Sequence, residues 1–140
     1  MPSIKVLKSD KRKVYKEIGR IYSPILKETI YFTSMGFNHL LYKRHRSPRK
    51  VSEQYLKLMC VDYLTDVVTK CRQVSQVRKI RRKFKGRWKK LVYYELIHEV
   101  KTGIKIKVII ERIGKGKLKF RSVMPYDKKS KLKNAQTGRS

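Results

Sequence analysis

His39 is the side chain in this sequence best suited to proton transfer, because an imidazole ordinarily titrates near neutral pH. Lys43 follows it by four residues, and Arg46 follows Lys43 by three. On a helix a spacing of four places His39 and Lys43 on one face, and Arg46 is positioned to continue that side. Neighbouring cations would hold a phosphate and favour the neutral imidazole, which can act as a base. The alternative is a surface or capping histidine without a chemical role.

A second group of polar side chains lies toward the C-terminus and consists of Glu111, Arg112, Lys119, Arg121 and Ser122. Arg112 precedes a predicted hairpin turn, and Lys119 and Arg121 follow that turn, so the three are expected to share one surface of a sheet. Arginine suits bidentate contacts with phosphate, and the hydroxyl of Ser122 can donate a hydrogen bond to a phosphoryl oxygen. The alternative is ordinary surface charge on a sheet, with a serine turned toward the core.

Residues 78–90 carry the densest charge in the chain, with nine basic residues among thirteen and no acidic one. Phe84 and Trp88 lie among these charges, a mixture that suits phosphate contacts combined with base stacking. Such a run repels itself unless a partner neutralises it, so a solvated loop without a partner is the weaker reading. The residues expected to contact nucleic acid are Arg46, Arg78, Lys79, Arg81, Arg82, Lys83, Lys85, Arg87, Trp88, Lys89, Lys90 and Lys119.

The overall composition also indicates a polyanionic partner. Lys and Arg number 38 against 10 Asp and Glu, which gives a formal charge of +28 in 140 residues. Like charges repel in a compact chain, and nucleic acid is the commonest polyanion that relieves this repulsion. Hydrophobic residues make up 40% of the chain, which is sufficient for the core of one domain.

The sequence lacks the motifs of several large enzyme classes. It contains no GxxxxGK[ST], GxSxG or HExxH motif, and no Cys/His cluster with zinc-ligand spacing. Acidic residues are too sparse for an obvious two-metal nuclease site. We therefore expect no cofactor and no metal. Cys60 and Cys71 are expected to be thiols in a reducing compartment, and no apolar run reaches the ~20 residues that span a bilayer. These features predict a cytoplasmic protein without a membrane partner.

The secondary structure that must position these residues begins with helices. Residues 28–33 are predicted as a strand, and Thr33 or Ser34 then caps a helix over 35–44 that buries Phe37, Leu40 and Leu41. After a loop over 44–50, a second helix begins at Val51 with Val51, Tyr55, Leu58 and Met59 as its apolar stripe. It breaks near 62–63, and a short helix follows over 64–70.

The C-terminal third is predicted to form strands over 91–100, 104–112 and 118–124, with Pro125 ending the last one. Phe120, Ser122 and Met124 are expected on one face of that strand. Helices followed by an antiparallel meander indicate an α+β fold, with N-terminal helices packed on a C-terminal sheet. We expect a basic arm over 1–24, with a short docked helix within 1–20 as the alternative. A domain over 25–126 is expected to follow, with a basic insertion at 72–90 that lacks a clear period, and then a basic tail over 127–140.

The order of these elements resembles the barnase–EndoU–colicin–RelE-like nuclease domains of the phage type. The matching N-terminal pieces are Ile30-Tyr31-Phe32-Thr33, Gly36-Phe37-Asn38-His39-Leu40, and the segment 44–49 followed by a helix with Leu56-Lys57-Leu58. The matching closing strands are Val92-Tyr93-Tyr94-Glu95-Leu96, Ile104-Lys105-Ile106-Lys107-Val108-Ile109-Ile110-Glu111-Arg112, and Phe120-Arg121-Ser122-Val123-Met124-Pro125. The resemblance covers about 27–125. The basic segment 72–90, the N-terminal arm and the C-terminal tail exceed what such a domain requires.

This resemblance implies a small metal-independent ribonuclease, often a toxin, in which the RNA 2′-OH attacks its own phosphodiester and leaves a 2′,3′-cyclic phosphate. It implies that His39, with Lys43 beside it, is the general acid or base. Arg112 and Arg121 would stabilise the transition-state charge, and Ser122 would orient the phosphate. The implied substrate is tRNA, mRNA or rRNA, and an acidic immunity or antitoxin protein is an implied partner.

Two other functions fit the same residues. Ribosomal and ribosome-associated proteins carry basic arms and tails, so the chain also fits a non-catalytic RNA-binding protein. A DNA-binding role has less support, because no helix-turn-helix pattern is present.

Overall fold

The computed structural model describes residues 3–43 and 47–127 of the chain. Arg46 and nearly all of the expected tail over 127–140 lie outside these residues. In chain order the elements are α1 (Ile4–Ile18), β1 (Arg20–Ser23), β2 (Glu28–Tyr31), α2 (Ser34–Leu41), α3 (Val51–Met59), the 3-10 turn η2 (Cys60–Tyr63), α4 (Leu64–Lys70), β3 (Val74–Phe84), β4 (Arg87–Lys101), β5 (Ile104–Ile113) and β6 (Leu118–Tyr126).

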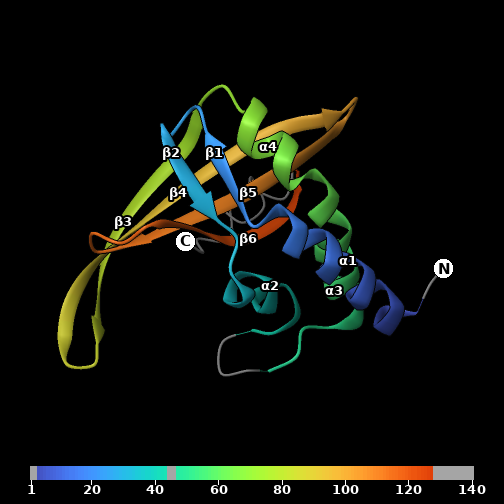
Figure 1. The fold of residues 1–140 in the computed structure, drawn as a ribbon, viewed down its shortest axis with the longest axis horizontal. Helices are drawn as coiled ribbons and strands as arrows, with labels where there is room; N and C mark the ends of the chain where they lie inside the picture. The colour runs from blue at the N-terminus through green and yellow to red at the C-terminus, as the bar shows by residue number, and fades with distance from the viewer. Residues whose placement is uncertain (1–2, 44–46, 128–140) are drawn as a thin grey trace.

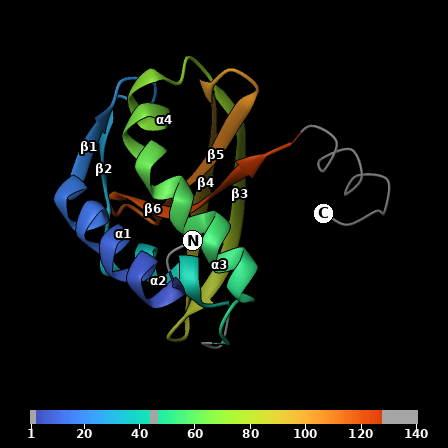
Figure 2. The same ribbon diagram turned by 90° about the vertical axis from the view of Figure 1, so that its right-hand side faces the viewer.

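The α+β fold is confirmed, with one sheet of strand order β1-β2-β6-β5-β4-β3. β3 to β6 form the antiparallel meander, whereas β2 pairs in parallel with the start of β6 and makes the sheet mixed. Helices α1, α3 and α4 pack together over one face of the sheet (Figures 1 and 2). None of the helices in the described part of the chain is both long and apolar enough to cross a membrane.

The N-terminal segment belongs to the domain, so the prediction of a basic arm over 1–24 is wrong and the alternative of a docked helix within 1–20 is confirmed. Ser3 caps α1 by accepting a hydrogen bond from the Val6 amide (3.2 Å), and α1 buries Leu7 and Tyr15 in the core. Most of its charged residues are exposed, but Lys11 pairs with Asp62 of η2 (2.6 Å) and the guanidinium of Arg12 lies 4.6 Å from the Phe37 ring centroid, so two of its cations also fasten the helix to the domain.

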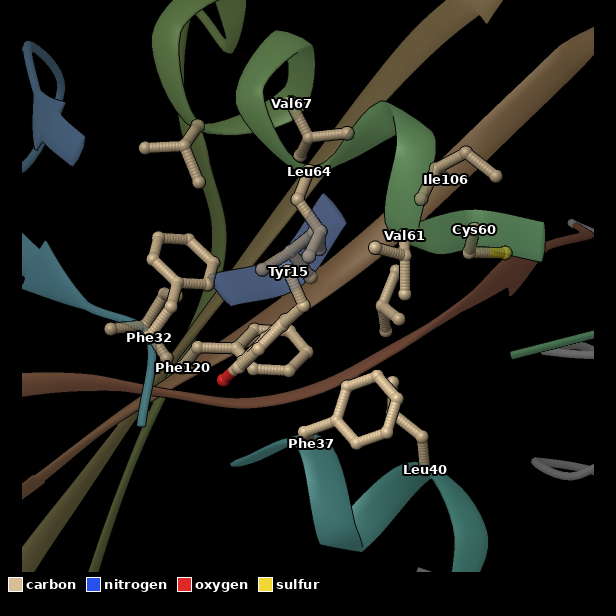
Figure 3. Close-up of a cluster of buried hydrophobic side chains, with 14 of the residues drawn as sticks. Tyr15, Phe32, Phe37, Leu40, Cys60, Val61, Leu64, Val67, Ile106 and Phe120 are labelled. Atoms are coloured by element: carbon tan, nitrogen blue, oxygen red, sulfur yellow. The ribbon is translucent and has the colours of Figure 1, made fainter. Parts of the chain in front are cut away.

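Aromatic rings join α1, α2 and the sheet in the core (Figure 3). The ring of Tyr15 contacts Phe32, Phe37 and Phe120 at centroid distances of 5.9, 5.2 and 5.8 Å. The Tyr15 hydroxyl donates a hydrogen bond to the backbone oxygen of Thr33 (2.7 Å), so this buried polar group is satisfied. The cluster therefore fixes the start of α2 against β6.

The segment 72–90 is a long hairpin, not an insertion without regular structure. β3 pairs with β4 from Val74 to Phe84, and Lys85 and Gly86 form the turn with positive φ. The far end of this hairpin projects beyond the helices (Figure 1). Most of β3 is exposed, so neither face needs apolar residues, and the alternation that identifies a half-buried strand is absent.

The remaining helix predictions are mostly confirmed, with one correction. α2 buries Phe37, Leu40 and Leu41, and the break after α3 occurs at η2. The apolar stripe predicted for α3 is wrong in part, because Val51 and Met59 are exposed by 58% and 47%. The buried face of α3 contains Gln54, Lys57 and Leu58. Lys57 thus extends from α3 to β6, where its Nζ donates a hydrogen bond to the backbone oxygen of Val123.

Strand β6 departs from the predicted alternation. Its pairing with β5 shifts between Ile109 and Ile110, so Arg121 is an extra residue in the ladder. Phe120 and Val123 both enter the core, and the two residues between them do not. Ser122 and Phe120 therefore do not share a face. Pro125 does not end the strand, which continues to Tyr126. On the side of β6 that faces β2, only residues 118–119 are paired, so at Pro125 this side is an open edge where a missing N–H breaks no hydrogen bond.

Gly36 sets the distance between α2 and β6. A Cβ at this position would lie 2.7 Å from both the Phe120 backbone oxygen and the Tyr15 hydroxyl. We expect Gly36→Ala to lower the free energy of unfolding by about 3 kcal/mol, because backbone and core would have to move apart. Urea denaturation measures this loss. Met35→Ala, a change at an exposed neighbour on the same helix, should leave the midpoint nearly unchanged, whereas equal midpoints for both variants would contradict the close approach.

Candidate active site

Helix α2 presents His39 to a cavity whose wall includes residues of β3, β4, β5 and β6. The hydroxyl of Thr33 accepts a hydrogen bond from the Gly36 amide (3.4 Å) and begins the helix, which brings His39 to its last turn. The backbone oxygen of His39 accepts a hydrogen bond from Arg49 Nε (2.9 Å), and Arg49 also pairs with Glu53 at 2.6 Å. The loop after α2 is thereby tied back to the start of α3, and the imidazole is held at a fixed place.

The bulge in β6 supplies the other half of the site. Because Arg121 is the extra residue, Arg121 and Ser122 both turn away from the core and line the same cavity as His39. A regular strand would place only one of these two residues on that side. The bulge is thus the feature that lets consecutive side chains act on one ligand.

Arg121 contacts His39 directly. Its Nη1 lies 2.9 Å from His39 Nε2. Because a guanidinium can only donate, Nε2 accepts this hydrogen bond, and the imidazole is neutral with its proton on Nδ1. Arg121 also lies 3.9 Å from the carboxylate of Glu111. Tyr93 pairs with Glu111 across β4 and β5, and its phenol lies near that carboxylate. A chain of four polar groups therefore links Tyr93 to His39.

Electrostatics keep the imidazole uncharged. Burial lowers the pKa of His39 from its ordinary value, and the positive charges of Arg121 and Arg49 lower it further, while Glu111 opposes them. The Tyr93 phenol shows the opposite change. Burial raises its pKa, and the neighbouring Glu111 adds to the increase, so the phenol keeps its proton at neutral pH. One group able to accept a proton and one able to donate it thus line the same cavity.

The His39 cavity has a volume of about 310 Å³ and a strongly cationic wall. Its charged lining comes from three parts of the chain: the end of α2 and the following loop, the hairpin, and β6. Among the described residues these cations are Lys43, Arg49, Arg78, Arg82 and Arg121. The arrangement suits a phosphodiester, because several donors converge where the anionic oxygens would lie.

Lys57 lies beneath this wall. Its Nζ donates hydrogen bonds to the backbone oxygen of Val123 (3.2 Å) and to Ser122 Oγ (3.4 Å). Burial lowers the pKa of this ammonium to about 8, and the charge of Arg49 contributes. Because Lys57 donates to Ser122 Oγ, the hydroxyl hydrogen of Ser122 is free to point into the His39 cavity.

The structure brings together part of the predicted site. His39, Lys43, Arg121 and Ser122 line one cavity, as do two members of the basic run, Arg78 and Arg82. Strand alternation explains the second pair, because these residues face Tyr93 and Lys89 across β4, on the cavity side. The other expected contact residues of the run, seven basic residues and one tryptophan, lie on the opposite face of the hairpin or nearer its tip: Lys79, Arg81, Lys83, Lys85, Arg87, Trp88, Lys89 and Lys90.

Arg112 does not join the others. It forms an ion pair with Glu28 of β2 and donates to the Gly116 backbone oxygen (2.9 Å). Adjacent strand residues face opposite sides, so Glu111 enters the site and Arg112 turns away from it. Lys119 pairs with Glu111 in the ladder but does not line the cavity.

The sequence did not indicate two members of the site, Tyr93 and Arg49, because their positions follow from strand register and from the loop after α2. Glu111 belonged to the group of polar strand residues that the sequence indicated, and the structure places its carboxylate 3.9 Å from Arg121. Among residues 3–43 and 47–127, no group of three or more His, Cys, Asp or Glu side chains is arranged to hold a metal ion.

Comparisons with known proteins add no relative. No family model matches the chain, and neither a curated protein nor a solved structure is significantly similar to it.

Proposed function

We propose that the protein is an endoribonuclease that cleaves RNA without a metal ion, by attack of a 2′-hydroxyl on the adjacent phosphodiester. The observation that supports this most directly is the contact between His39 Nε2 and Arg121 (2.9 Å) inside a cationic cavity. A neutral imidazole beside a phosphate-binding guanidinium is the pairing that this reaction needs, one group for the proton and one for the charge.

In the proposed reaction the phosphate competes for Arg121 and releases Nε2 of His39. The 2′-hydroxyl then gives its proton to Nε2 while its oxygen forms a bond to phosphorus. The bond between phosphorus and the 5′ oxygen of the next nucleotide breaks, and that oxygen takes a proton from Tyr93. The products are a 2′,3′-cyclic phosphate and a 5′-hydroxyl.

The remaining side chains have supporting roles in this proposal. Arg121 moves with the phosphate and stabilises the charge that develops on its oxygens, and Ser122 donates a hydrogen bond to one of them. Lys43, Arg49, Arg78 and Arg82 hold the flanking phosphates. Dependence on the substrate's own 2′-hydroxyl would restrict cleavage to RNA.

The test uses a labelled RNA in EDTA and a matched oligonucleotide with a 2′-O-methyl group at every position. We expect discrete fragments from the first that end in 2′,3′-cyclic phosphate, and none from the second. Binding of both with cleavage of neither would replace this proposal with that of a non-catalytic RNA-binding protein in the cytoplasm, on the ribosome or free.

This second function has its own support in the hairpin, whose outer face carries Lys79, Arg81 and Lys83 away from the His39 cavity. We expect their joint change to Gln to weaken RNA binding and to reduce the slope of log K against log salt by about 2–3, because three phosphate contacts are lost. Filter binding across a salt series measures this. The same change at the exposed α1 residues Lys5, Lys13 and Lys16 should leave the slope nearly intact; equal effects of both sets would remove the hairpin from the interface.

The family resemblance and an acidic inhibitor remain parts of this proposal. The resemblance rests on the order of elements. The inhibitor rests on the net charge of +28, which would steer an acidic immunity protein to the cavity at a high rate. If the protein is a toxin, such a partner would cover the His39 cavity.

A further inference from the structure

A second hollow of about 160 Å³ adjoins the His39 cavity on the sheet. The two share Arg78, Tyr93 and Ile109 in their walls, so they are parts of one groove. The residues found only in the second hollow include Gln76 and Glu95, and we call it the Glu95 hollow.

Strand register fixes how the two are related. Gln76, Glu95 and Ile109 lie opposite one another on β3, β4 and β5, and Ser122 of the His39 cavity continues this row on β6. The next row, two residues along each strand, contains Tyr93 and Glu111. Such rows are about 6.6–6.8 Å apart, so a group in the Glu95 hollow lies within one nucleotide of a phosphate held by Arg121.

Glu95 is the unexpected residue of this groove. Only ten acidic residues occur in the chain, and this one lies on the face that carries the phosphate-binding cations, with its side chain 15% exposed. Its nearest cation, Lys107 Nζ, is 4.0 Å away, which is beyond hydrogen-bond distance. Within the described residues the Glu95 carboxylate accepts no hydrogen bond. Among the described residues this carboxylate is not one of the fully enclosed polar groups without a partner, so its oxygens open to the hollow, where a ligand can supply hydrogen-bond donors.

A phosphate cannot supply those donors, but a nucleobase can. An ionised carboxylate only accepts hydrogen bonds, and the exocyclic amino groups of cytosine, adenine and guanine only donate. Uracil presents a carbonyl oxygen at the position of the cytosine amino group, and this oxygen would face the carboxylate. Arg78 is exposed and its guanidinium lies over the buried Tyr93 ring, 5.3 Å from the ring centroid, so the outer side of the guanidinium plane is available for a base to stack on.

We propose that the Glu95 hollow binds a base next to the cleaved phosphate, accepts a hydrogen bond from its exocyclic amino group through Glu95, and disfavours uracil. Gln76, opposite Glu95, is able to bond a second polar atom of the base. This inference rests on the proposed ribonuclease function, which it extends from any RNA to RNA with an amino-bearing base at the cleavage site.

Cytosine and uracil make the sharpest test, because they have the same size and differ at this amino group. The first measurement is the affinity of uncleavable 2′-O-methyl trinucleotides of cytidine and of uridine. We expect the protein to bind the cytidine form about tenfold more tightly, in line with the discrimination of one good base contact. Glu95→Gln should bring the two affinities within about threefold, because an amide can also donate to the uracil oxygen. Glu99→Gln removes the same charge from an exposed position of β4 and should keep the tenfold ratio.

The second measurement is cleavage of DNA strands that contain one ribonucleotide, either cytidine or uridine, with the base of the following nucleotide varied in turn. Cleavage of all substrates at equal rates, with equal trinucleotide affinities, would overturn the base site and leave the nuclease intact. A cytidine preference in binding that Glu95→Gln abolishes, without cleavage of any substrate, would support the base site and overturn the nuclease. If the ratio of cytidine to uridine affinity were the same in the unmutated protein and in Glu95→Gln, Glu95 would not contact the base and would only pair with Lys107.

Discussion

His39→Ala is expected to reduce the rate of RNA cleavage by about 10²–10⁴-fold, the usual contribution of a positioned general base. The imidazole lies beside Arg121 at the cavity wall, and Tyr93, the other proton-carrying group of the proposed reaction, is protonated at neutral pH and so cannot accept the 2′-hydroxyl proton. RNA affinity should remain within a few fold, because the cations that hold the phosphates are unchanged. Single-turnover cleavage and filter binding with the same RNA separate the two quantities.

His98→Ala is the matched control for this change. His98 is a half-buried histidine on β4 that does not line the His39 cavity, and its replacement should leave cleavage within a few fold. If His39→Ala lowered affinity and cleavage by the same factor, His39 would be a binding residue. If neither changed, the assignment of the cavity as an active site would be wrong.

The pH dependence follows from the environment of the same imidazole. A general base must be unprotonated, so the rate falls when His39 becomes protonated, as the pH drops through its pKa. Burial and Arg121 lower this pKa, which places the acid limb of kcat/KM below about 6.5, the ordinary value for histidine. A pH–rate profile of the unmutated protein with its midpoint above that value would contradict the proposed environment.

Arg121→Ala is expected to lower kcat by about 10²–10³-fold, the usual loss when one preorganised donor to a developing oxyanion is removed. The same change removes a positive charge 2.9 Å from His39 Nε2, so the acid limb of the profile should move to higher pH. A residue with only a structural role would not move that limb. Steady-state kinetics across a pH series measure both effects in one experiment.

Arg121→Lys and Arg20→Ala complete this test. The lysine keeps the charge but cannot form two parallel hydrogen bonds, so it should restore the position of the acid limb and only part of kcat. Arg20, an exposed residue on β1 at the far edge of the sheet, controls for the loss of one positive charge from the protein. Equal losses in Arg121→Ala and Arg20→Ala would mean that Arg121 acts through net charge alone.

The sequence by itself predicted α2, α3, α4 and the last three strands of the meander, and it indicated His39 as a candidate, because these depend on local patterns. α2 has a capping threonine and apolar residues at helical spacing, and β5 alternates Ile and Lys because only one of its faces is buried. The density of positive charge over 78–90 indicates a polyanion-binding segment whatever the fold, because it depends on composition alone.

Tertiary structure decided which of the candidate residues meet. The bulge at Arg121 directs it and Ser122 into one cavity, and a register shift of this kind depends on the partner strand β5. Alternation on β5 sends Arg112 to Glu28 and brings Glu111 to the site. β3 escaped prediction because an exposed strand is stabilised by pairing with β4 and not by a buried face. Local patterns therefore determined the elements, whereas strand register, a nonlocal property, determined the site.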